Sequence, residues 1–171
     1  LENLFVNGDF SGEAAPAADG AAQPDWEQGT APPGWSFWQS EASPGRPGWD
    51  REVGRDGPGS GTLTAVAEGC LIQSTDVQPG EVYGVSAWRR VQGEGSATIR
   101  VRWQTPEGTW HAVQLDRVLG TAAPPGEWGQ VAGTVTVPDG AGKLIVLLQA
   151  GGQRSEDDVI WWDDVVVFRA D

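Results

Sequence analysis

The C-terminal stretch VIWWDDVVVF, residues 159–168, is the most informative segment of this sequence. Both alternating sets of side chains in it are apolar, except at the adjacent carboxylates Asp163 and Asp164. This pattern predicts a strand that is buried on both faces and paired along both edges. Because burying a bare charge is very costly, each carboxylate needs a hydrogen-bond donor, a cation or a metal nearby. The rest of the chain has to supply these partners.

Further short segments with period-two alternation precede this stretch and are separated by turn residues such as Pro106-Glu107-Gly108. They cover residues 3–10, 34–38, 62–67, 70–77, 82–91, 97–104, 110–115, 128–137 and 143–150. Two Gly- and Pro-rich segments, 12–34 and the connection through Trp49 to Gly61, show no periodicity and are predicted to be long loops. About ten strands without an amphipathic helix predict an all-β sandwich of two antiparallel sheets, a single domain over residues 1–171.

Composition excludes several classes of partner. The chain of 171 residues has 24 acidic and 11 basic residues, a formal charge of −13, which argues against nucleic acid or an anionic membrane. No segment approaches the roughly eighteen apolar residues of a membrane helix, and no basic-then-apolar leader is seen, so we expect a mature, soluble protein. The single Cys70 and single His111 give little material for nucleophilic catalysis. Ten tryptophans against one tyrosine suggest indole platforms for a ligand.

Alternation also predicts which way each side chain points. The expected core set is Tyr83, Val85, Ala87, Ile99, Val101, Trp103, Leu144, Val146 and Leu148. If these strands share a sheet, its outer face carries Trp88, Arg90, Arg100, Arg102, Gln104 and Gln149. An indole beside guanidinium and amide groups suits a sugar, which offers an apolar CH face and vicinal hydroxyls.

Two other arrangements remain open. The outer sheet face could be an ordinary solvated surface with Trp88 half covered by a loop, or the ligand site could be built from Trp26, Trp38 and Trp49 in the long loops. The acidic net charge makes a neutral sugar the first expectation, although the arginines could accommodate uronic acids.

Several motifs resemble carbohydrate-binding modules of families four, nine, sixteen and twenty-two, in the right order and over nearly the whole chain. They are NLFVNGDF at 3–10, Gly34-Trp35, PGEVYGVSAW at 79–88, Glu127-Trp128 followed by VTVP at 135–138, and WDDV at 162–165. The resemblance implies a jelly-roll sandwich of the galactose-binding type, without catalysis. It further implies a secreted monomer that binds a plant or algal polysaccharide or oligosaccharide and targets an attached glycoside hydrolase or lyase. Trp35 and Trp128 match positions that are usually core.

The resemblance also implies a structural calcium where the first and last strands meet. Asp163 falls on a ligand position, and the backbone carbonyl of Asp9 matches another. Ser11 stands where these families usually have glutamate, which leaves Asp56 or Glu52 as substitutes. Calcium takes several oxygen ligands, including backbone carbonyls. The alternative is a metal-free Asp163 that accepts backbone hydrogen bonds.

Two other functional classes compete with a binding module. A jelly-roll glycosidase or lyase needs two carboxylates at a fixed separation or a set of bases, and the candidates Glu156, Asp157 and Asp158 lie in a turn-like segment. A structural sandwich without glycan affinity would use its tryptophans to pack against a partner domain.

Overall fold

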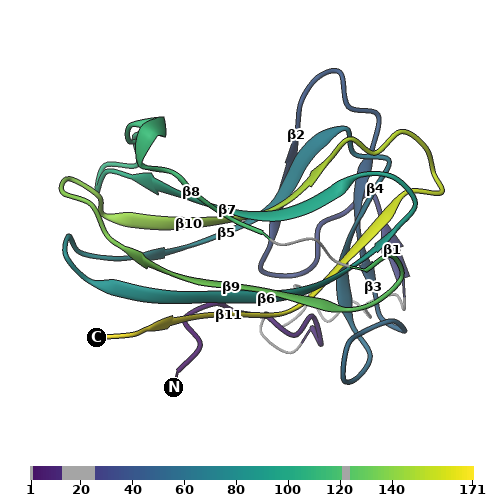
Figure 1. The fold of residues 1–171 in the computed structure, drawn as a ribbon, viewed down its shortest axis with the longest axis horizontal. Coiled ribbons are helices and arrows are strands. Elements are labelled where there is room, and N and C mark those ends of the chain that lie inside the picture. The colour runs from purple at the N-terminus through teal and green to yellow at the C-terminus, as the bar shows by residue number, and fades with distance from the viewer. Residues whose placement is uncertain (1, 13–25, 121–123) are drawn as a thin grey trace, which may run out of the picture.

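The computed structural model describes residues 2–12, 26–120 and 124–171, in which eleven strands form two antiparallel sheets stacked face to face (Figure 1). The six-stranded sheet has the order β1 (Trp26–Gln28), β3 (Arg46–Asp50), β4 (Ser60–Thr64), β11 (Val159–Arg169), β6 (Val82–Gln92) and β9 (Gly129–Thr136). The five-stranded sheet has the order β2 (Ser36–Gln39), β5 (Glu68–Asp76), β10 (Lys143–Gly151), β7 (Ser96–Gln104) and β8 (Arg117–Leu119). The predicted all-β sandwich is therefore confirmed.

Strand β11 is an interior strand, as its apolar pattern predicts. It pairs with β4 through residues 159–162 and with β6 along most of its length. A β-bulge lies between Asp163 and Val166, where Asp164 adopts a left-handed backbone with φ of 48°. The extra residue shifts the alternation, so that Ile160 and Trp162 before the bulge and Val165 after it all point into the core.

The core lies between the inner faces of the two sheets. All nine residues predicted to point inward are at most 4% exposed. Trp35 is also buried, as expected, and its ring stacks on Phe10 with a centroid distance of 5.4 Å. The core therefore occupies one face of each sheet, and the other face of each sheet points away from it.

Two of the predicted strands are not regular strands in the structure. Residues 3–10 form no regular strand, because Asn7 and Phe10 adopt left-handed backbone conformations, although the Leu4 amide still donates to the Val167 carbonyl at 2.8 Å. The predicted strand 110–115 is instead an isolated bridge at Trp110 followed by a 3-10 helix, Val113–Leu115. Strand β8 then follows at 117–119.

Strands β1 and β3 lie in segments that were predicted to be loops. β3 contains Pro47 and Gly48, which obscure its alternation, and it is held by pairing to β4. β1 is a three-residue edge strand paired to β3. Both depend on a neighbouring strand for their conformation. No helix in the described ranges is long and apolar enough to cross a membrane.

Candidate functional site

The structure divides the predicted outer-face residues between the two sheets. Trp88 and Arg90 lie on β6 of the six-stranded sheet, whereas Arg100, Arg102, Gln104 and Gln149 lie on β7 and β10 of the five-stranded sheet. The prediction that they form one surface is therefore wrong. Strands β6 and β7 are joined by three residues, yet the chain crosses between sheets there instead of forming a hairpin.

The outer face of the five-stranded sheet carries a groove with a volume of about 730 Å³. Its floor is made by side chains that alternate with the core residues of β5, β10 and β7. The strand registers align them in two rows: Cys70, Gln149 and Thr98 in one, and Ile72, Leu147 and Arg100 in the next. Arg102 lies two residues beyond Arg100 on β7 and faces the same side of the sheet.

Two tryptophans stand at opposite ends of this groove. Trp38 on β2 is 51% exposed and lies beside Cys70 in the sheet, and Trp110 after β7 is 48% exposed. Figure 1 shows β2 and the segment with the 3-10 helix at opposite ends of this sheet, the helix on the left and β2 on the right. Trp38 is in register with Thr98 and Trp110 with Gln104, so the line between the indoles crosses the strands obliquely.

Charged groups gather at the Trp110 end. The Arg100 guanidinium donates to Asp116 Oδ2 at 3.2 Å, and Arg102 Nε lies 3.2 Å from the same oxygen. The Arg102 guanidinium also stacks over the Trp110 ring at 4.1 Å from its centroid. At the other end, the Thr98 hydroxyl donates to Gln149 Oε1 at 3.2 Å. The groove thus combines accessible indoles with oriented polar groups.

Trp110, Asp116 and Thr98 were not among the predicted site residues. Trp110 could have been found from the Pro-Glu-Gly turn, because residues flanking a hairpin turn face each other and Gln104 was already placed on the outer face. Thr98 alternates with Ile99 and belongs to the same face as Arg100. Asp116 follows a 3-10 helix, and no local pattern indicates its direction.

The other predicted tryptophans do not join the groove. Trp49 on β3 is 1% exposed, and its indole N–H donates to the Phe10 carbonyl at 2.8 Å, so its prediction as a ligand platform is wrong. The side chain of Trp26 lies outside the described residues. Trp88 is covered by the Arg55 guanidinium at 4.2 Å, and Gln104 does not line the groove. Arg90 stacks on Trp161 at 5.2 Å, on the opposite sheet from the groove.

The bulge of β11 explains both carboxylates. Asp163 is 3% exposed and accepts two backbone N–H groups, from Arg55 to Oδ2 and from Asp164 to Oδ1, both at 2.7 Å. Burial raises the pKa of Asp163 to about 7, and the charges of Asp164 and Asp9 act in the same direction. The Asp164 carboxylate accepts a hydrogen bond from Arg55 Nε at 2.7 Å.

Part of the predicted calcium ligand set lies near Asp163. Asp9 is close enough to influence its pKa, and the carbonyls of Asp9 and Phe10 approach Gly59 so closely that a Cβ there would lie 3.3 and 2.3 Å from their oxygens. Asp56 does not join this group in the described geometry, because its side chain is 73% exposed and pairs with Arg55 at 2.7 Å. Among the described residues, no three His, Cys, Asp or Glu side chains form a metal-binding cluster, so backbone carbonyls would have to complete a calcium site.

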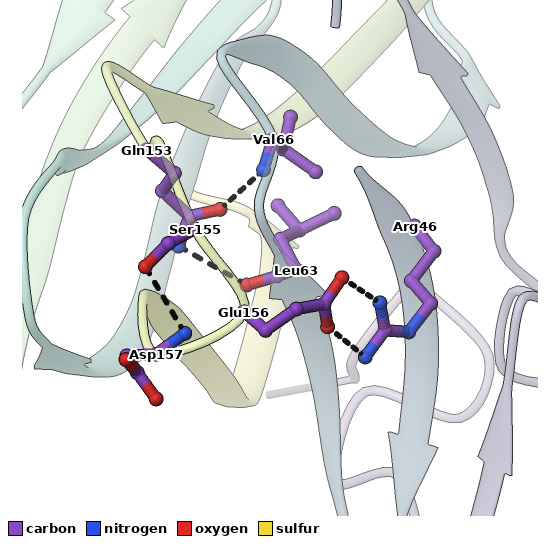
Figure 2. Close-up of polar contacts among 7 residues, drawn as sticks. All are labelled: Arg46, Leu63, Val66, Gln153, Ser155, Glu156 and Asp157. Atoms are coloured by element: carbon purple, nitrogen blue, oxygen red, sulfur yellow. Dashed lines mark hydrogen bonds and ion pairs between the residues drawn. The ribbon is translucent and has the colours of Figure 1, made fainter. Parts of the chain in front are cut away.

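The acidic segment 156–158 stabilises a loop. Glu156 forms a two-pronged ion pair with Arg46 on β3, at 2.7 and 2.5 Å, and Gln153 bridges the Val66 amide and the Leu63 carbonyl (Figure 2). Asp158 accepts backbone hydrogen bonds from Arg154 at 2.7 Å, Glu94 at 2.8 Å and Ser155 at 3.0 Å, which lower its pKa. The carboxylates of Glu156 and Asp158 are therefore occupied by structural contacts.

Cys70 and His111 also have structural surroundings. Burial raises the pKa of the Cys70 thiol to about 12, so it stays protonated at neutral pH. His111 Nδ1 accepts from the Ala112 amide at 2.8 Å, and its Nε2 lies 2.7 Å from the Asp139 carbonyl. Nε2 therefore carries the proton and donates to this carbonyl, which leaves neither nitrogen for general-base chemistry.

Comparison with solved structures identifies the fold. The TmCBM61 carbohydrate-binding module, solved with β-1,4-galactotriose, superimposes with a TM-score of 0.57 over 99% of this chain and 100% of that one, at 14% identity. Modules of families 4, 16 and 22 match as well. This chain has the jelly-roll fold of carbohydrate-binding modules. No family model and no curated protein matches the sequence.

Two catalytic proteins share the same fold. A cyclase from Fischerella sp. TAU has a TM-score of 0.66 at 11% identity, covering 99% of this chain and 97% of that one. The enzymatically active domain of bacteriophage CBA120 tailspike protein 4 has a TM-score of 0.62 at 16% identity and covers 98% of this chain. This chain spans only 21% of the length of that tailspike chain. The fold alone does not distinguish a binding module from an enzyme. That distinction has to come from the residues of the site.

Proposed function

We propose that this chain is a non-catalytic module that binds a plant or algal polysaccharide or oligosaccharide in the groove of the five-stranded sheet. The observation that carries the proposal is the pairing of two half-exposed indoles, Trp38 and Trp110, with a floor of amide and guanidinium groups between them. Indoles stack on the CH faces of sugar rings, and the polar groups bind the hydroxyls.

The scale of the expected affinity follows from these contacts. Stacking on an indole contributes about 1 kcal/mol beyond area burial, and a hydrogen bond to a charged donor about 1.5 to 3 kcal/mol. A few such contacts, offset by the ordering of the ligand, give micromolar to millimolar dissociation constants. That range suits a module whose role is to hold an attached secreted glycoside hydrolase or lyase on its substrate.

We further propose that the protein binds one structural calcium ion at the bulge of β11. The buried Asp163 carboxylate and the charge of the nearby Asp9 support this proposal. Calcium would neutralise a carboxylate that burial otherwise disfavours in its charged form. The ion would stabilise the fold at a distance from the groove, because β11 belongs to the other sheet.

A glycan microarray followed by isothermal titration of the best ligand tests the binding proposal. Wild-type protein should bind at least one plant or algal glycan with one site per chain, and Trp38→Ala should weaken that binding by about tenfold, or about 1.4 kcal/mol. Absence of binding across the array, with the protein folded, would contradict the proposal and favour a structural sandwich.

A further inference from the structure

We propose that the groove prefers glycans that carry isolated carboxylate groups, such as single uronic acid units on an otherwise neutral chain. This inference rests on the proposed function of the groove and specifies its ligand class. It reverses the first expectation from net charge, because the charge that the ligand meets in the groove has the opposite sign to the charge of the whole chain.

The balance of charge at the Trp110 end of the groove is positive. Two guanidiniums, Arg100 and Arg102, share a single oxygen of Asp116, whose side chain is only 5% exposed. One buried carboxylate therefore neutralises only one of the two guanidinium charges. The arginine side chains are 34% and 26% exposed, so the uncompensated charge is open to the groove.

The other charges on this sheet face do not cancel it. Glu68 lines the opposite end of the groove, four residues along the strands from the row of Arg100, which corresponds to about 13 Å. Lys143 and Asp76 are register partners beyond Arg102 and offset each other in formal charge. An anionic group on the ligand would therefore gain the most favourable electrostatic energy beside Arg100 and Arg102.

The arginines also have the right chemistry for a carboxylate. The Arg102 guanidinium carbon lies over the Trp110 ring, 4.1 Å from its centroid, and this cation–π contact restrains where the guanidinium sits. Its Nε is buried and lies 3.2 Å from Asp116 Oδ2. A guanidinium is planar and can bind a carboxylate through two parallel hydrogen bonds, which are shorter and stronger than those to a hydroxyl.

The remainder of the groove suits a neutral sugar. Trp38, Cys70, Ile72 and Leu147 form an apolar half that lies toward β2 and β5. The chain as a whole carries a formal charge of −13, which repels a densely charged polyanion. At physiological ionic strength, charges more than about 8 Å apart are largely screened from each other. A single carboxylate in the groove therefore interacts mainly with the arginine pair. Sparse acid groups therefore fit better than a continuous run of them.

The test uses a panel of uronic-acid-bearing plant and algal polysaccharides, each paired with its carboxyl-reduced form, in which every carboxylate has become a hydroxymethyl group. Titration at low salt should show the acidic form of the best ligand binding about tenfold more tightly than its reduced partner. Raising the salt should shrink this difference. Arg100→Gln should remove most of it, whereas Arg169→Gln, which makes the same charge change at an ion pair on β11, should leave it intact.

The outcomes separate the two proposals. Equal or tighter binding of the reduced forms, lost in Trp38→Ala, would overturn the preference for carboxylates and keep the glycan-binding function. Binding of sulfated glycans with no effect of carboxyl reduction would likewise overturn it. No binding to the panel by a protein that binds a neutral glycan on the array would overturn the preference for carboxylates alone, and no binding to either the panel or the array would overturn both proposals.

Discussion

Trp38 and Trp88 carry the same side chain in opposite surroundings. Trp38 is half exposed beside a groove, whereas the Arg55 guanidinium covers Trp88 on the other sheet. An indole can stack on a sugar only if its face is accessible. At this scale, accessibility and not residue type determines which of the ten tryptophans are available to a ligand.

Trp110→Ala should weaken glycan binding by at least about tenfold, or about 1.4 kcal/mol, because it removes a stacking surface and the support of Arg102. Trp88→Ala is the matched control and should leave binding unchanged. Isothermal titration with the best array ligand measures both. Normal binding by Trp110→Ala together with loss in Trp88→Ala would move the site to the six-stranded sheet.

Asp163 is the residue on which the calcium proposal depends. Excess chelator should lower the melting temperature of the wild type, since an ion bound only to the folded state stabilises it by about 2.7 kcal/mol when present at a hundred times its dissociation constant. Asp163→Ala should remove the difference between calcium and chelator, and the exposed Asp56→Ala should retain it. An unchanged wild-type melt and no metal by elemental analysis would leave Asp163 as a purely hydrogen-bonded carboxylate.

At the scale of elements, hydrogen bonds and an ion pair fix the loop that connects the two sheets. The segment between β10 and β11 is fastened to β3 by Arg46 and Glu156 and to β4 by Gln153 (Figure 2). Asp158 links the same segment to the turn between β6 and β7. Gly93 in that turn has φ of +75°, and a Cβ there would lie 2.3 Å from Asp158 Oδ1, so the turn and the carboxylate fit closely together.

Asp158 should make stability depend on pH in the acidic range. Its backbone hydrogen bonds hold its pKa below the usual value, so the unfolded chain binds this proton more readily than the folded one. The stabilisation is present above the ordinary carboxyl pKa and is lost as pH falls through the lowered pKa. Asp158→Asn should be less stable at pH 7 and lose less stability on acidification, as urea unfolding at pH 7 and pH 3 would measure. A parallel pH dependence in both proteins would contradict this role.

At the scale of the whole molecule, the two sheets have different tasks. The five-stranded sheet presents the groove, and the six-stranded sheet carries the β11 bulge and packs against the N-terminal segment, whose Asn3 side chain bonds the Val165 carbonyl at 2.9 Å. Ligand binding and metal binding are therefore expected to be separable by mutation. The core between the sheets holds the groove and the β11 bulge in place.

Purified protein should release no sugar product from any polysaccharide that it binds. Glu156 is held in an ion pair, Cys70 stays protonated, and both His111 nitrogens are occupied. Reducing-end and unsaturated-product assays over the same panel provide the measurement. Turnover that persists after repeated chromatography would show an enzyme on this fold.

The sequence alone determined the all-β class, the core-facing residues of β6, β7 and β10, and the interior position of β11. These follow from local alternation, which depends only on the two-residue period of a strand. It also pointed to Arg100, Arg102, Gln149 and Trp38, which the structure places around one groove. The short strands β1 and β3 were not predicted, because their conformation depends on pairing with a neighbouring strand and not on their own sequence pattern.

The tertiary structure alone decided which outward faces belong together. Strands β6 and β7 are consecutive and similar in pattern, yet their connection crosses between sheets, which sends Trp88 and Arg100 to opposite sides of the molecule. The bulge at Asp164 and the burial of Trp49 are likewise invisible in the pattern, since both alternating sets of β11 are apolar and an indole suits core and surface equally. Alternation gives each strand two faces, but only long-range pairing and sheet packing choose the neighbours of each face.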